Sequence, residues 1–305
     1  MLSFSFPTLR DRAAAEPILR AAACPGTDYN FLTLYLWAPG YGGVCITDSF
    51  VTQRIEDGDR LFYLYPACLR DEKRAVDAIM DDCRARGARL CFFGLTAQSR
   101  DALESLYPGR FAFSSDRDHS DYLYEIGAFC TLAGRKLQSR RNFCNRFERE
   151  HPGWRTVPIT AEVLPLCRKI CDGWDAQHEA AGTALLERDA LALLFDSYES
   201  LGAQGLLLLD GENPLAFSVA SASTPTVFDV HFEKALPDVP GAYAMISREF
   251  ARHIARSCPG VRYLNREDDM GEPNLRRAKL ACQPALILEK FIAEDREVSP
   301  CDFGN

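Results

Sequence analysis

Three ionisable residues alternate along one strand-like stretch of the chain. Asp229, His231 and Glu233 are separated by apolar residues within TVFDVHFEKA, residues 226–235. Because successive side chains of a strand point to opposite faces, the three would share one face. Ionisable groups buried without partners cost free energy, so this face is predicted to be either solvated or the wall of a polar pocket. In a pocket, the histidine or a carboxylate could take the proton from an attacking amine or hydroxyl.

A turn and a helix follow this strand directly. The turn contains Pro237, Asp238, Pro240 and Gly241, and the helix is predicted to begin at Ala242. A helix entered in this way directs free backbone N–H groups and the positive end of its dipole at an anion. The turn matches neither the dinucleotide-binding pattern nor the P-loop pattern. An anion cradle and an ordinary strand-to-helix turn both fit it.

Two further stretches concentrate charge. Residues 265–280, NREDDMGEPNLRRAKL, place four acidic residues before Arg276, Arg277 and Lys279. They are either a solvated loop and helix start, or a site whose carboxylates bind an ammonium group and whose cations bind a phosphate. Residues 134–150 hold six basic and two acidic residues, a net charge of +4. This basic helix is predicted either to bind phosphate or to be a solvated face.

The composition is that of a soluble globular protein. The 305 residues carry a net charge of −8, which falls on residues 153–305, since residues 1–152 hold 20 basic and 20 acidic side chains. Twelve cysteines occur without a CxxC pair, so they are predicted to be reduced packing residues, and no metal is expected. No apolar run approaches the roughly 20 residues of a spanning helix. A cytoplasmic protein without a transmembrane segment is expected.

The order of predicted elements repeats in the two halves of the chain. In the first half, the segments FLTLYLW, VCITDSFVTQRI and RLFYLY are predicted to form an antiparallel meander. In the second half, GLLLLD, LAFSVASAS and TVFDVHFEKA are predicted as consecutive strands, with helices before and after them and a last strand at PALILEKF. The predicted fold is α+β, with a first domain over residues 1–152 and a second over residues 153–305.

Three long segments carry a resemblance to a known family. DYLYEIGAFCTLAGRKLQSRRNFCNRFEREHP, HFEKALPDVPGAYAMISREFA and YLNREDDMGEPNLRRAKLACQP resemble the phosphatidylglycerol lysyltransferase C-terminal family. The resemblance implies two tandem GNAT-like domains, the acyl-CoA N-acyltransferase fold, with mixed sheets flanked by helices. It also implies an enzyme that transfers an amino acid from aminoacyl-tRNA to a lipid or peptide acceptor, with no further cofactor.

The family pattern falls on specific positions of this sequence. The candidate catalytic residues, each a base or an ammonium ligand, are Glu233 and Glu267, on which the family pattern falls, and His231, which shares the strand with Glu233. The implied substrate-binding residues are Lys234, Tyr243, Asn265, Asp269, Arg276 and Lys279. The implied anion- or tRNA-binding residues of the basic helix are Lys136, Arg140 and Arg141. The implied reaction is direct attack of the acceptor on the aminoacyl ester, with catalysis by proximity and proton removal.

Two other functions are compatible with the sequence. The fold and the anion cradle would serve an N-acyltransferase that uses acyl-CoA as its donor, although the turn before Ala242 contains a single glycine. A module that keeps the fold but only binds tRNA or another anion would depend on Arg140 and Arg141 for that binding.

Overall fold

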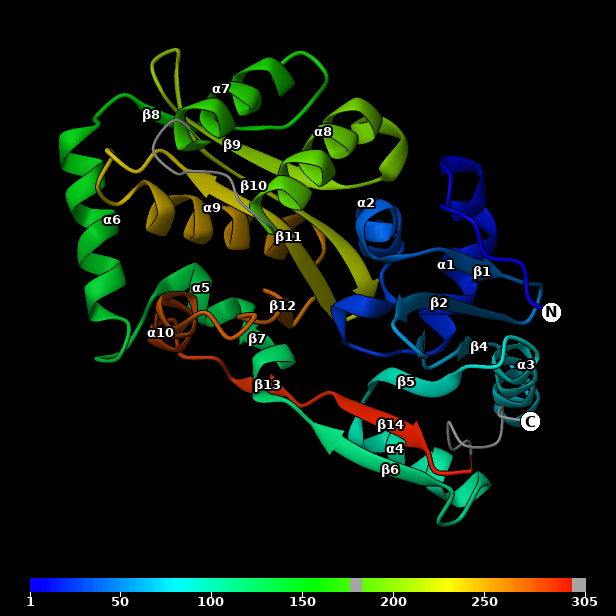
Figure 1. Ribbon diagram of the computed structural model, residues 1–305. Coiled ribbons are helices and arrows are strands. Elements are labelled where there is room, and N and C mark those ends of the chain that lie inside the picture. The colour runs from blue at the N-terminus through cyan, green and yellow to red at the C-terminus, as the bar shows by residue number, and fades with distance from the viewer. Residues whose placement is uncertain (176–182, 298–305) are drawn as a thin grey trace. The chain divides into compact units, whose positions relative to one another are not determined.

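The computed structural model describes residues 1–175 and 183–297, and Figure 1 shows their helices and strands. The chain divides into two compact units, which are Met1–Asp121 with the segment beginning at Leu288, and Tyr122–Ile287. This division differs from the predicted boundary between residues 152 and 153. Residues 122–152 join the second unit because their strand pairs within its sheet and their helices pack against its longest buried helix.

The first unit contains a mixed sheet with helices packed against it. Its elements are η1 (Leu9–Asp11), α1 (Arg12–Ala21), η2 (Thr27–Tyr29), α2 (Phe31–Tyr41), β1 (Val44–Ile46), β2 (Phe50–Asp57), β3 (Arg60–Leu64), β4 (Ala67–Cys68), α3 (Glu72–Ala85), β5 (Arg89–Leu95), α4 (Ala97–Leu106), β6 (Phe111–Ser115), η3 (Arg117–His119) and β14 (Phe291–Asp295). The strand order is β1-β2-β3-β5-β14-β6, with β4 paired to β2. Strands β1, β2 and β3 are antiparallel, and α3 carries the chain to β5, which is parallel to β3.

The segment FLTLYLW, which was predicted as a strand, belongs to the helix α2. The prediction was wrong because an unbroken apolar run does not distinguish a strand from a buried helix. Most side chains in the first two turns of α2 are buried, and the half-buried face is formed by Thr33 and Trp37, so no charged face marks its helical period. The side-chain oxygen of Asn30 accepts a hydrogen bond from the N–H of Leu32 at 2.9 Å and caps the helix. This asparagine before the apolar run was the available signal for a helix.

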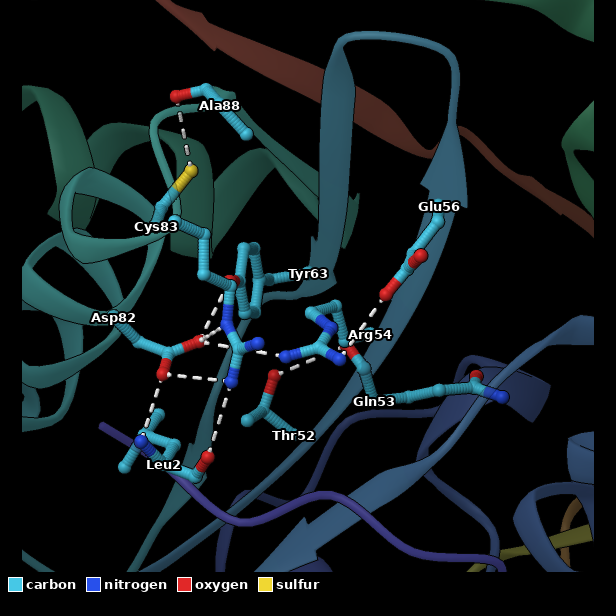
Figure 2. Close-up of polar contacts among 10 residues, drawn as sticks. Leu2, Thr52, Gln53, Arg54, Glu56, Tyr63, Asp82, Cys83 and Ala88 are labelled. Atoms are coloured by element: carbon cyan, nitrogen blue, oxygen red, sulfur yellow. Dashed lines mark hydrogen bonds and ion pairs between the residues drawn. The ribbon is translucent and has the colours of Figure 1, made fainter.

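Asp82 of α3 holds the N-terminal segment against the first sheet (Figure 2). Its buried carboxylate accepts hydrogen bonds from the N–H of Leu2 at 2.7 Å, the hydroxyl of Tyr63 at 2.8 Å and the guanidinium of Arg86 at 2.8 Å. Arg54 lies 3.7 Å from the same carboxylate. Burial alone would raise the pKa of Asp82, but these donors hold its pKa below the ordinary value. The carboxylate therefore stays charged and stabilises this packing.

The second unit is built on a sheet in the order β13-β7-β12-β11-β10-β9-β8. Its elements are β7 (Asp121–Glu125), α5 (Ile126–Thr131), α6 (Gln138–Glu150), β8 (Trp154–Pro158), α7 (Leu164–Asp175), α8 (Thr183–Leu201), β9 (Gln204–Asp210), β10 (Asn213–Thr224), β11 (Val227–Ala235), α9 (Ala242–Ser257), β12 (Tyr263–Asn265), α10 (Pro273–Ala281) and β13 (Leu286–Leu288). Strands β8 to β11 are antiparallel, and α9 carries the chain to β12, which is parallel to β11.

Helices cover both faces of this second sheet. Helix α9 packs on β9, β10 and β11 with Met245 and Phe250 in the core, and α7 packs on β10 and β11 (Figure 1). Two neighbouring residues of β11 mark the two faces. Glu233 accepts a hydrogen bond from Ser247 of α9, whereas Lys234 pairs with Glu187 of α8. The face that carries Glu233 is the one on which the candidate site is built.

Several predicted segments change at their ends. VCITDSFVTQRI is divided into β1 and β2, and PALILEKF is divided into β13 and β14, which belong to different sheets. One of the helices predicted before the strands of the second half, over residues 161 to about 178, corresponds to α7 (Leu164–Asp175), and residues 176–178 of that prediction lie outside the described residues. Within the described ranges, no helix is both long and apolar enough to cross a membrane. The α+β class, with two mixed sheets flanked by helices, is confirmed.

Candidate active site

A pocket of about 480 Å³ opens in the second unit. One wall is the face of β11 that carries His231 and Glu233, and a second wall is formed by Glu267 and Lys279 after β12 and on α10. The start of α9 contributes Tyr243 to the lining. The structure therefore brings the strand face and the charged stretch 265–280 together, because β11 and β12 are adjacent parallel strands whose ends meet at one edge of the sheet.

His231 lies at the wall of this pocket between two polar partners. Its side chain is fully buried, and its Nε2 lies 2.8 Å from the hydroxyl of Ser221 on β10. Its Nδ1 lies 3.8 Å from a carboxylate oxygen of Glu267. Burial disfavours the charged form of Glu267 and raises its pKa, and His231 opposes this shift. A carboxylate with a raised pKa is a stronger base than usual, so the pair is suited to accepting a proton in the pocket.

The carboxylate of Glu233 is held by two residues outside the predicted site, Arg266 and Ser247. Arg266 donates to its carboxylate at 2.7 Å and to the hydroxyl of Tyr243 at 2.6 Å, and Ser247 donates to the same carboxylate at 2.5 Å. Burial opposes the positive charge, but Glu233 raises the pKa of Arg266 well above its ordinary value. Arg266 was missed as a site residue. Its position directly after β12, beside the predicted Asn265, was the signal that could have found it.

The loop after β12 has a strained backbone that several predicted residues hold in place. Glu267 has a φ of 59°, a conformation that non-glycine residues rarely adopt. The side chain of Asn265 accepts a hydrogen bond from the N–H of Glu267 at 2.9 Å. The ammonium of Lys279 donates to the carbonyls of residues 266, 267 and 268. These two residues therefore act on the loop backbone, and Lys279 also lines the pocket whereas Asn265 does not.

Asp269 and Arg276 form a second support for this loop. Arg276 donates twice to the buried carboxylate of Asp269, at 2.8 Å and 2.6 Å, and Tyr122 donates its hydroxyl to the same group. The Arg276 guanidinium is the largest cause that holds the pKa of Asp269 well below its usual range. Neither residue lines the pocket. Their position indicates that they stabilise the loop.

The basic helix contributes two of its three predicted residues to the pocket. Lys136 and Arg140 line it, whereas Arg141 donates to the carbonyls of residues 132 and 134. Arg140 donates from Nη1 to the sulfur of Cys282 at 2.8 Å. Its Nε and Nη2 are buried and have no hydrogen-bond partner among the described residues. The first turn of α6, which contains Arg140, therefore lies at the pocket.

Lys234 and Asp229 of β11 do not line the pocket either. Lys234 is on the opposite face of β11, 3.0 Å from Glu187 and over the ring of Trp174, in a separate cavity of about 230 Å³. The alternation that places Glu233 in the pocket turns its neighbour away. Asp229 is fully buried, accepts a hydrogen bond from Ser223 at 3.2 Å and does not line the pocket.

The glycine of the predicted anion cradle is required by packing. Gly241 has a φ of 89°, and a side chain at this position would come within 2.7 Å of the carbonyl oxygen of Phe143 on α6. The start of α9 therefore lies close against α6, and Gly241 lines the pocket at this contact. Among the residues that the structure describes, no group of three or more potential ligands could hold a metal ion.

Solved structures share this architecture. A conserved protein of unknown function from Bacteroides thetaiotaomicron is 33% identical, with a TM-score of 0.89 over 97% of this chain and 100% of its own. The C-terminal domain of a putative lysylphosphatidylglycerol synthetase from Agrobacterium fabrum is 14% identical, with a TM-score of 0.67 over 96% and 92%. FemX is 10% identical, with a TM-score of 0.60 over 95% and 97%. The last two likenesses show the fold alone and confirm the predicted tandem GNAT-like architecture.

Sequence comparisons assign the family. An uncharacterized protein of Mycoplasmoides gallisepticum is 25% identical over 181 residues, and the match spans 57% of this chain and 56% of that curated relative. The family described as phosphatidylglycerol lysyltransferase, C-terminal, matches residues 21–294, which include every element that lines the pocket. The chain belongs to the phosphatidylglycerol lysyltransferase C-terminal family.

Proposed function

We propose that this chain is an acyltransferase that moves an aminoacyl group from aminoacyl-tRNA to a hydroxyl or amine of a lipid or peptide acceptor. The observation that carries the proposal is the pairing of His231 with Glu267, a carboxyl group of raised pKa, at the wall of a pocket of about 480 Å³. Family membership and the fold shared with FemX support a transferase. A donor of this kind places the protein in the cytoplasm.

The proposed reaction is one acyl transfer without a covalent enzyme intermediate. The acceptor oxygen or nitrogen attacks the ester carbonyl carbon and forms the new acyl bond, while Glu267 takes the proton of the acceptor. The bond to the ribose oxygen of the tRNA breaks, and the same proton returns to this oxygen as it leaves. His231 lies 3.8 Å from the Glu267 carboxylate before it takes the proton, and Ser221 holds the imidazole ring. The pocket holds the two substrates close together.

The remaining polar residues are proposed to position the substrates and the base. Glu233 and Arg266 form a buried pair that fixes Tyr243 at the pocket mouth. Lys279 and Asn265 keep Glu267 turned towards the pocket. Lys136, in the turn before α6, and Arg140, in the first turn of α6, are the proposed contacts for phosphate of a substrate.

The test measures loss of the aminoacyl ester from charged tRNA in the presence of lipid and peptide acceptors. Glu267→Gln removes the base, and we expect its rate to fall by about 10²- to 10⁴-fold, the usual contribution of general-base catalysis. Glu272→Gln is the matched control, because this exposed residue on the same segment does not line the pocket. Equal rates for both variants, or no consumption above the protein-free rate with any acceptor, would contradict the proposal.

A further inference from the structure

We propose that the first unit holds a second ligand site, a cavity that binds a free amino acid with an apolar side chain. The cavity has a volume of about 310 Å³, and all of its lining residues lie between positions 22 and 102 of the chain. This volume is at the lower end of the range for small-molecule sites, so it suits a small ligand. The inference does not depend on the proposed transfer, because it concerns a different cavity in the other unit.

The cavity lies at the place in the first sheet that corresponds to the pocket in the second sheet. In each unit two adjacent parallel strands are joined by one helix, β3 and β5 by α3, and β11 and β12 by α9. Tyr65 and Thr96, which directly follow β3 and β5, line the cavity, and so does Glu72 at the start of α3. Ligands commonly bind at the carboxyl ends of parallel strands. The position therefore indicates a ligand site, and the lining residues decide the class of ligand.

Two lining side chains of opposite charge have no ionic partner. One oxygen of Glu72, Oε1, accepts a hydrogen bond from the hydroxyl of Tyr65 at 2.7 Å, and Arg70 is exposed at the edge of the cavity. Within residues 1–175 and 183–297, neither Glu72 nor Arg70 forms an ion pair. The third charged lining residue, Asp71, caps α3 and accepts a hydrogen bond from the N–H of Arg74 at 3.1 Å. The ammonium and the carboxylate of one amino acid would each find a partner here.

The remainder of the lining suits the uncharged part of such a ligand. Thr96 caps the start of α4 at the cavity, and the positive end of the dipole of this helix also favours a carboxylate. Burial raises the pKa of Cys24 to about 12 and the pKa of Cys68 to about 11, so both lining thiols are uncharged. The ring of Tyr29 and several aliphatic side chains provide surface for an apolar side chain of the ligand.

The first arm of the test measures binding to the wild type by titration calorimetry. Free leucine and free phenylalanine are each compared with the amine that lacks the carboxylate and with the acid that lacks the ammonium group. We expect at least one of the two amino acids to bind saturably, and both of its analogues to bind about tenfold to a hundredfold more weakly, because each loses one hydrogen bond between charged groups. No saturable binding of either amino acid, or an analogue that binds as tightly as its amino acid, overturns the proposal.

The second arm locates the bound amino acid. Glu72→Gln keeps an oxygen that can accept from Tyr65 and removes the charge, and Asp81→Asn is the matched control, an exposed acid of the same helix that does not line the cavity. We expect Glu72→Gln to weaken binding of the amino acid by about tenfold to a hundredfold and to bind the acid without the ammonium group at least as tightly as the wild type does. Asp81→Asn should change neither affinity. An equal loss for both ligands, or no loss, overturns the proposal, and so does a loss caused by Glu267→Gln instead, which would place the ligand in the pocket of the second unit.

Discussion

Replacement of Lys279 by methionine distinguishes a loop support from a substrate ligand. The ammonium of Lys279 reaches from α10 to the carbonyls of residues 266, 267 and 268, which lie on the loop that presents Arg266 and Glu267 to the pocket. Methionine keeps an unbranched apolar stem of nearly the same length and removes the charge and the donors. If Lys279 holds the loop, the variant should lose stability and transfer rate together.

The size of the expected effect follows from these contacts. A hydrogen bond to a charged group contributes about 1.5–3 kcal/mol, and three of them from one ammonium group are not additive. Release of the lysine side chain returns up to about 2 kcal/mol of conformational entropy. The strained backbone at Glu267, where φ is 59°, stores about 1–3 kcal/mol, which the loop can release once Lys279 is gone. We expect a net loss of roughly 2 kcal/mol in the free energy of unfolding.

Urea unfolding and the transfer assay measure the two quantities. The matched control is Arg277→Met, an exposed residue of the same helix that donates to the side chain of Asn274. We expect this control to change the free energy of unfolding by less than about 0.5 kcal/mol. A Lys279→Met variant as stable as this control, but with a reduced transfer rate, would refute the assignment and make Lys279 a substrate ligand.

Two further predictions concern the supports of the site. The pKa of Asp269 is held below its usual range by Arg276, so its contribution to stability is present above the ordinary carboxyl pKa and is lost as the pH falls through the lower folded-state pKa. Urea unfolding between about pH 2 and 6 should therefore show a weaker acid dependence for Asp269→Asn than for the wild type, and parallel curves would contradict this. Gly241→Ala combines a positive φ with a close approach to the carbonyl of Phe143, whereas Gly134→Ala, at a φ of 85°, meets no atom within 4 Å. Thermal unfolding should show the larger loss for Gly241→Ala, by about 1–3 kcal/mol more, and equal losses would exclude the packing contact as the cause.

Local patterns in the sequence were sufficient for most of the elements and for the class of the fold. The alternation at the end of β11 places Glu233 in the pocket, because the two-residue period of a strand is a property of the backbone itself. A register shift between Val230 and Phe232 interrupts this period, so that His231 lines the pocket beside Val230. Asp229, which was predicted on the same face, pairs with Ser221 beyond the shift and does not line the pocket. The same period turns Lys234 to the other face, and its assignment to the substrate site came from the family pattern instead. The apolar run in α2 was misassigned because its half-buried face carries Thr33 and Trp37 and no charged residue, so the sequence lacks the polar period that identifies a helix.

Only the tertiary structure decided which residues distant in the sequence contact one another. Arg266 meets Glu233 because β12 pairs in parallel beside β11, and nothing in the local pattern of either strand specifies that neighbour. Lys279 and Asn265 were predicted as substrate contacts, yet they bond to the backbone of the strained loop around Glu267. Which partner a charged side chain takes depends on distances across the fold. Local patterns therefore indicated where charged side chains gather along the chain, and the packing of strand, loop and helix decided which of these side chains meet.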